Sequence, residues 1–186
     1  MVLNFRNAVV LALLAAVAYL IYREHFPGLG DSDVAKLVRQ HRSADPAAQT
    51  LLKHRIMTLY SPVRDYPTVI KMLDSASPTT QTLAIEVLAE KVERRALPTL
   101  LEMLADTARA EPVKQALATA MGGLSVREAL PRLVELTDLA EPQGVRAAAH
   151  NALLKLTEAG AQVKLGANTR EQWTLWLRSQ QAGGIR

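Results

Sequence analysis

The chain has 186 residues, of which 49% are hydrophobic and 4% aromatic, and its formal net charge is +4 at pH 7. This length allows one domain with a sizeable core, and the composition excludes wholesale disorder. There is no cysteine, which excludes disulfide scaffolds, thiolate metal sites and cysteine nucleophiles. Abundant alanine and leucine with few aromatic residues favour packed helices over β-sandwiches or barrels.

The first element in chain order is an apolar stretch. Residues 8–22 contain no charged side chain, and a helix extended back to Val2 would reach across a hydrocarbon core of about 30 Å. We therefore predict a membrane anchor helix over residues 1–24. A cleaved signal peptide, ending near Ala16-Val17-Ala18, and a buried core helix are the alternatives. The predicted anchor positions are Ala8, Leu11, Leu14, Val17, Tyr19 and Tyr22.

The orientation of this anchor depends on two opposing signals. More lysines and arginines come after the stretch than before it, which favours a cytoplasmic C-terminal side. However, a short positive tail such as the one around Arg6 is typical of an anchor that exports the domain behind it, and long domains translocate largely regardless of charge. We favour a domain on the periplasmic side of a bacterial inner membrane, with the cytoplasmic face as the alternative.

Helix-start signals are dense after a predicted linker over residues 25–32, which holds one proline and two glycines. A capping side chain precedes a proline at Asp45-Pro46, Ser61-Pro62 and Ser77-Pro78, and each pair predicts a helix start. Ser125-Val126-Arg127-Glu128 has the pattern of a capping box. No stretch shows the two-residue alternation of a strand.

Self-similarity is the strongest signal in the chain. Arg95–Leu104 matches Glu128–Thr137 at five of ten positions with an offset of 33, and Tyr66–Leu73 fits the same frame at an offset of 31 on the N-terminal side. Apolar residues of the preceding helices keep a fixed distance from Pro67, Pro98 and Pro131. A two-helix unit that recurs at such a near-constant interval is the signature of an α-solenoid.

These residues also resemble a known family. The Ala-Leu-Pro-x-Leu segments, and Val145-Arg146 with the alanines after them, resemble HEAT repeats of the bilin-lyase type over roughly residues 46–160. The resemblance implies an all-α fold: a short α-solenoid of about three to four HEAT-like helix pairs over residues 33–168, after one transmembrane helix. The family usually places an Asp before the Val-Arg pair, which bonds an arginine of the neighbouring repeat. Because Glu111 and Glu141 stand near those places, we expect this ladder to be absent or remodelled.

The C-terminal residues 169–186 are expected to form a capping helix and a tail. Thr169 and the residues after it have cap chemistry, and Trp173, Trp176 and Leu177 share one helical face at spacings of three and four. We favour a lid that covers the apolar face of the last repeat. The alternative is that these side chains are anchors for a partner protein.

The search for reactive residues predicts no catalytic, cofactor-binding or metal-binding residue. His25, His41, His54 and His150 show no metal-ligand spacing, although His41 and His54 lie on successive predicted helices and could approach each other. We expect His150 to have a packing role. Gly122-Gly123 is interpreted as a helix end. Glu86, Glu90 and Glu93 are expected on one solvated helical face.

We therefore predict a protein without enzymatic activity or cofactor: a membrane-anchored scaffold that binds a membrane protein complex or another protein, as an accessory or assembly subunit. The anchor would contact the lipid bilayer. An acidic middle between basic ends argues against nucleic acid, and no small-molecule substrate is expected. Two alternatives remain, namely an exported soluble module left by signal-peptide cleavage and a repeat-based enzyme of the bilin-lyase type. Residues 78–160 contain no aromatic side chain, which argues against the enzyme.

Overall fold

The computed structural model describes Val17, residues 32–157 and residues 163–182. All regular elements in these residues are helices, and no strand occurs among them, so the all-α prediction is confirmed for this part of the chain. Short 3-10 helices follow α4 as η1 (Met72–Asp74) and precede α6 and α8 as η2 (Arg94–Ala96) and η3 (Arg127–Ala129). The α-helices are α2 (Asp33–Ser43), α3 (Pro46–Leu59), α4 (Tyr66–Lys71), α5 (Pro78–Glu90), α6 (Leu97–Ala105), α7 (Glu111–Gly123), α8 (Leu130–Glu135), α9 (Gln143–Thr157) and α10 (Thr169–Ala182).

The chain divides into two compact units, residues 1–68 and residues 69–186, with the boundary inside α4. In the first unit α2 and α3 pack against each other. The N–H of Ala35 donates to Ser32 Oγ at 3.1 Å, and the N–H of Ala48 donates to Asp45 Oδ1 at 2.9 Å. Both helices therefore begin with a side-chain cap, and the start predicted at Asp45-Pro46 is confirmed.

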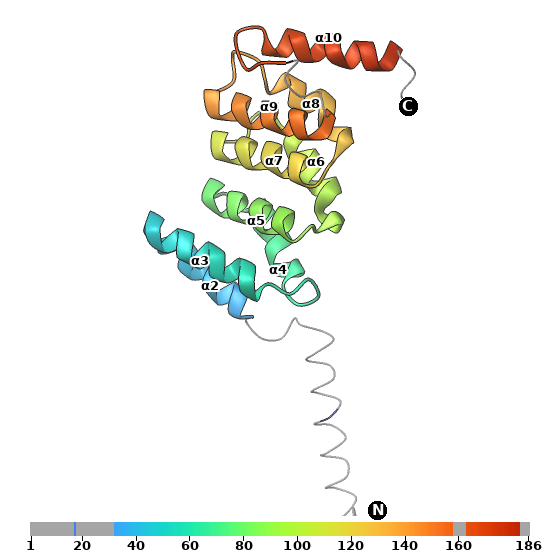
Figure 1. Cartoon of the computed structure of the whole chain (residues 1–186). Helices are drawn as coiled ribbons and strands as arrows, with labels where there is room; N and C mark the ends of the chain where they lie inside the picture. The colour runs from blue at the N-terminus through green and yellow to red at the C-terminus, as the bar shows by residue number, and fades with distance from the viewer. Residues whose placement is uncertain (1–16, 18–31, 158–162, 183–186) are drawn as a thin grey trace, which may run out of the picture. The chain divides into compact units, whose positions relative to one another are not determined.

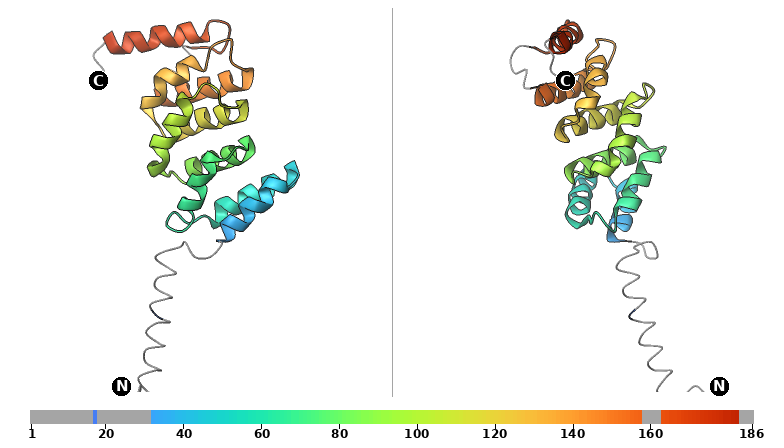
Figure 2. Two further views of the ribbon diagram at one scale, coloured as in Figure 1. Left: turned by 180° about the vertical axis from the view of Figure 1, so that it is seen from behind. Right: turned by 90° about the vertical axis from the view of Figure 1, so that its right-hand side faces the viewer.

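The second unit is a layered stack of helices. Helices α5, α7 and α9 lie one above the other, with α7 in contact with both neighbours (Figure 1), and the same order is seen from behind and from the side (Figure 2). Helix α6 packs against α7, and α8 packs against α9. Helices α5, α7 and α9 each bury aliphatic side chains completely, among them Leu88, Leu117 and Leu153. This arrangement is that of a helical-repeat solenoid.

A very close approach joins α7 and α9. A Cβ atom added to Gly122 would lie 2.8 Å from the Cα of Ala152, and one added to Gly144 would lie 2.2 Å from the Gln115 side chain. Because Gly122 and Ala152 lie towards the C-terminal ends, and Gln115 and Gly144 towards the N-terminal ends, the two helices run parallel. Helix α7 does end at Gly123 as predicted, but the lack of a side chain at Gly122 is needed for packing.

The turns that follow α5 and α7 are equivalent. Val92 and Ser125, which the repeat places at equivalent positions, have positive φ angles of 52° and 57°. The N–H of Glu93 donates to the Leu88 carbonyl at 2.9 Å, and the N–H of Val126 donates to the Met121 carbonyl at 3.0 Å. Each bond runs from an N–H to the carbonyl five residues earlier, which is the hydrogen bond that identifies a Schellman motif. This motif ends a helix with a left-handed residue. The sequence repeat thus extends to the backbone of the turns.

Of the other three helix-start predictions, one is confirmed without its cap and two are wrong. Ser61-Pro62 begins a turn, in which the Asp65 carboxylate accepts the Ser61 N–H at 2.8 Å, and α4 begins at Tyr66. Ser77-Pro78 does begin α5, but the Ser77 side chain makes no capping hydrogen bond. The capping box at Ser125 is wrong, since Ser125 belongs to the left-handed end of α7 and an N-cap requires an extended backbone.

The predicted anchor lies outside the described residues, apart from Val17, which is helical and about half exposed at 51%. Among the described residues no helix has the length and apolarity needed to cross a membrane.

Candidate protein-interaction surface

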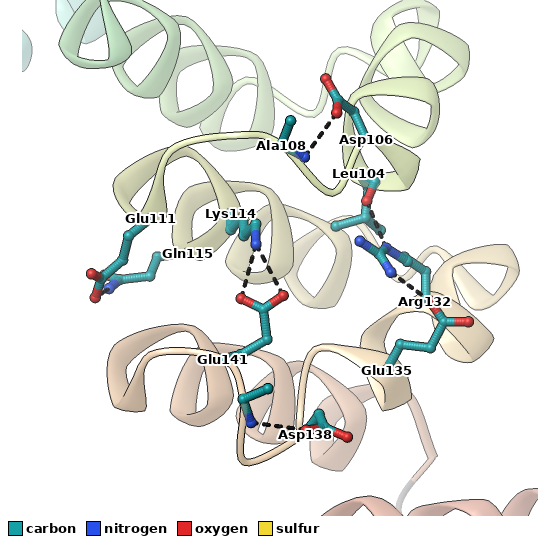
Figure 3. Close-up of polar contacts among 11 residues, drawn as sticks. Leu104, Asp106, Ala108, Glu111, Lys114, Gln115, Arg132, Glu135, Asp138 and Glu141 are labelled. Atoms are coloured by element: carbon teal, nitrogen blue, oxygen red, sulfur yellow. Dashed lines mark hydrogen bonds and ion pairs between the residues drawn. The ribbon is translucent and has the colours of Figure 1, made fainter.

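The repeats of the second unit are joined by an ion pair between α7 and the turn before α9. Lys114 Nζ donates to both carboxylate oxygens of Glu141 at 2.9 Å (Figure 3). The two side chains are only 15% and 19% exposed, so the pair is largely shielded from solvent screening. This pair joins neighbouring repeats in the region where the resemblance led us to expect the family's ladder to be absent or remodelled.

A second contact between repeats is made by Arg132 of α8. Its Nε donates to the carbonyl of Leu104 at 2.9 Å, close to the C-terminal end of α6, and its guanidinium also binds Glu135 (Figure 3). A cation at a helix C-terminus satisfies a carbonyl that has no partner within the helix. Arg132 therefore fixes α8 against the end of α6.

The turns before α7 and α9 each hold an aspartate that accepts a backbone N–H. Asp106 Oδ1 accepts from Ala108 at 2.9 Å, and Asp138 Oδ1 accepts from Ala140 at 2.8 Å. Asp138 Oδ2 also binds the guanidinium of Arg170 in α10. The backbone hydrogen bond and the Arg170 cation together lower the pKa of Asp138, so this carboxylate remains charged at neutral pH.

Trp173 is the central residue of the C-terminal packing. Its side chain is 0% exposed, and its indole Nε1 donates to His150 Nδ1 of α9 at 3.1 Å. The rings of Trp173 and Trp176 meet edge to face with centroids 5.9 Å apart. Trp176 and Leu177 are partly exposed. A partner protein could not reach Trp173 unless α10 moved away from α9, which favours the lid over a partner anchor at this residue.

The hydrogen bond from Trp173 indicates the tautomer of neutral His150. An indole N–H can only donate, so Nδ1 of the neutral imidazole must be unprotonated and accept the hydrogen bond. The histidine is 6% exposed, and this burial lowers its pKa. The packing role predicted for His150 is thereby given a specific partner. The sequence carries no signal for this contact, because the two residues lie far apart in the chain on different helices.

The other predicted polar residues do not converge on a reactive centre. His41 is buried, whereas His54 is exposed on α3. Glu93 is not on the helical face of Glu86 and Glu90, because α5 ends at Glu90 and Glu93 pairs instead with Arg95 at 2.9 Å. No group of three or more metal-ligating side chains is found within the described ranges.

Helices α5, α7 and α9 have exposed residues at equivalent positions of the repeat, and these residues form the outward face of the stack. One row contains Glu86, Thr119 and Asn151, which the repeat makes equivalent and which are partly or fully exposed. The row one turn further contains Glu90, Gly123 and Lys155, all of them exposed. The face is thus acidic on α5, has small side chains on α7 and is basic at Lys155 of α9.

Comparison with known families supports the repeat assignment. Residues 66–154 match the family model for HEAT repeats, a span that runs from the start of α4 almost to the end of α9. HEAT repeats are typical of scaffolds for protein-protein interaction. No curated protein matches the chain.

Proposed function

We propose that this protein is a membrane-anchored scaffold that binds another protein through the outward face of α5, α7 and α9. The observation that carries the proposal is the stack of these three helices, in which the Gly122–Ala152 approach and the Lys114–Glu141 pair hold α7 against α9. A rigid layer of this kind can bind a partner without first being ordered, which limits the entropic cost of association. The partner is expected to belong to a membrane complex, for which this chain would be an accessory subunit.

The charges of this face indicate how a partner would lie on it. Glu90 and Lys155 are exposed at equivalent positions of α5 and α9, and Thr119 and Gly123 lie between them on α7. A helix or extended segment that crosses the layer would place basic residues over α5 and acidic residues over α9. The small side chains on α7 would allow its backbone to approach closely. Such charge complementarity contributes mainly to specificity and association rate.

The experiment compares Thr119→Arg with Thr107→Arg in the full chain. Both threonines are exposed, but Thr119 is central on the face and Thr107 lies in the turn between α6 and α7. Each tagged variant would be purified from detergent-solubilised membranes, and its co-purifying proteins quantified by mass spectrometry. We expect Thr119→Arg to lose a stoichiometric partner that Thr107→Arg retains. Equal recovery with both variants would contradict the proposed face.

The proposed membrane attachment rests on the apolar stretch at residues 8–22. An integral anchor resists extraction with alkaline carbonate, whereas a cleaved leader would leave a shorter, extractable chain. Carbonate extraction followed by N-terminal sequencing therefore separates these two forms. We expect the membrane pellet to contain a chain that begins at residue 1. Release of a chain that begins after Ala18 would contradict the anchor.

A further inference from the structure

A groove of about 660 Å³ opens between α10 and the turn that precedes α9. Leu139 on the turn and Leu175 on α10 line it, and they are 59% and 64% exposed, among the most exposed large apolar side chains of the described residues. The ion pair of Asp138 with Arg170 joins the two walls. The groove thus presents two leucines to water.

Apart from Arg170, which pairs with Asp138, the charges on the α10 wall of this groove are arranged symmetrically along the helix. Glu171, Thr174, Leu175 and Arg178 all line it, at helical spacings of three, one and three. Glu171 and Arg178 are both exposed to solvent. They are about 10 Å apart along the helix axis, which is too far for a mutual ion pair. They lie at equal spacings on either side of the midpoint between Thr174 and Leu175.

We propose that two copies of this chain associate through α10 in a two-fold symmetric dimer. When two such helices lie antiparallel with the axis between Thr174 and Leu175, Glu171 of each copy faces Arg178 of the other. An isologous interface contains every contact twice, so both charges of both helices find partners. The exposed leucines at positions 175 and 139 are then removed from water on both sides of the axis.

The charge order on α10 favours a second copy over an unrelated partner. A face with an acidic residue, an apolar centre and a basic residue is complementary to its own antiparallel image. Trp173 and His150 hold the opposite side of α10 against α9, so the dimer requires no rearrangement of the fold. The inference is independent of the face proposed on α5, α7 and α9, because it involves different residues.

The test uses charge exchange in the full chain, purified in mild detergent and measured by sedimentation equilibrium. Glu171→Arg places like charges opposite each other twice in the dimer, and Arg178→Glu does the same with the opposite sign. Exposed ion pairs are individually weak, so we expect each single variant to weaken dimerisation by about tenfold. The double variant Glu171→Arg/Arg178→Glu should dimerise like the original chain.

Mixing the two single variants gives the most direct readout. One copy then has arginine at both positions and the other has glutamate at both, so a heterodimer regains both attractive pairs. A dimer of the original chain, single variants that dimerise about tenfold more weakly and a heterodimer on mixing would support the proposal. Three results would overturn it: a monomer at about 100 µM, a dimer that is insensitive to the charge changes, or no heterodimer on mixing. Circular dichroism checks that each variant is folded.

Discussion

The neighbouring glycines of α7 allow a controlled test of the contact between α7 and α9. Gly122 and Gly123 are adjacent in the same helix, yet a Cβ at Gly122 would meet the backbone of Ala152 whereas one at Gly123 would meet no atom within 4 Å. Alanine at either position therefore raises the helix propensity of the same last turn of α7. Only the substitution at Gly122 also changes the packing between the two helices.

The size of the difference follows from the distances. Replacing a helical glycine by alanine stabilises a protein by about 0.5–1 kcal/mol, which is the whole effect expected for Gly123→Ala. At Gly122 the added Cβ would lie 2.8 Å from Cα and 3.0 Å from Cβ of Ala152, whereas carbon atoms pack at about 3.5–4.0 Å. The contacted Cα cannot rotate away, so the helices must separate, and such overpacking costs about 1–3 kcal/mol.

The two variants are thus expected to differ by about 1–3 kcal/mol in the free energy of unfolding, with Gly123→Ala above the original chain and Gly122→Ala below it. Urea unfolding followed by circular dichroism measures this difference by linear extrapolation. Ala152→Gly removes one of the two short contacts, so it should destabilise the Gly122→Ala variant less than it destabilises the original chain. Equal stabilisation by both alanines would refute the close approach.

Three further predictions concern the ion pair, the left-handed turn and the buried histidine. Lys114→Met leaves the shielded Glu141 carboxylate without its cation and should cost about 1–3 kcal/mol; Lys114→Met/Glu141→Leu should recover most of it, as a double-mutant cycle in urea would measure. Val92→Gly should raise the free energy of unfolding by about 0.5–1 kcal/mol, because relief of left-handed strain exceeds the entropic cost of glycine. The control is Val63→Gly, at an exposed valine without a positive φ, which should not raise the free energy of unfolding. Burial lowers the pKa of His150, so the unfolded chain takes up this proton first and stability should decrease as the pH falls below about 6.5. His150→Asn, which keeps an acceptor near the position of Nδ1 and does not titrate there, should flatten this decrease in unfolding curves recorded between about pH 7 and pH 5.5.

The helical-repeat fold could be predicted because its signal is both periodic and local. Pro67, Pro98 and Pro131 occupy the second position of α4, α6 and α8, where a proline fits without loss of a hydrogen bond. Whether a proline fits at such a position depends only on the residues next to it in the sequence. The near-constant interval between these prolines therefore identifies the second helix of each pair.

The errors and omissions come from contacts that one local pattern cannot specify. Ser125 matches an N-cap in sequence, but the end of α7 needs a left-handed residue at that place, and one residue cannot adopt both conformations. In the same way, the left-handed Val92 follows the end of α5, so Glu93 lies outside this helix. Two contacts depend on how the helices stack, namely the Trp173–His150 hydrogen bond and the Lys114–Glu141 pair. No local sequence pattern indicates either contact. The groove beside α10 depends on the same stacking, and no sequence pattern indicates it.

The turn aspartates explain how a turn inside a repeat can also hold α10. Asp106 holds its own turn with Oδ1, while Oδ2 pairs with the nearby Arg109 at 2.9 Å. Asp138 holds the equivalent turn in the same way, but its Oδ2 receives Arg170 from the terminal helix instead. Beside the Trp173–His150 contact, α10 is thus held by an arginine that takes the place of the neighbouring one on an aspartate oxygen already present in the turn. Any repeat with this turn could in principle receive a closing helix, which makes the length of the array easy to change in evolution or by design.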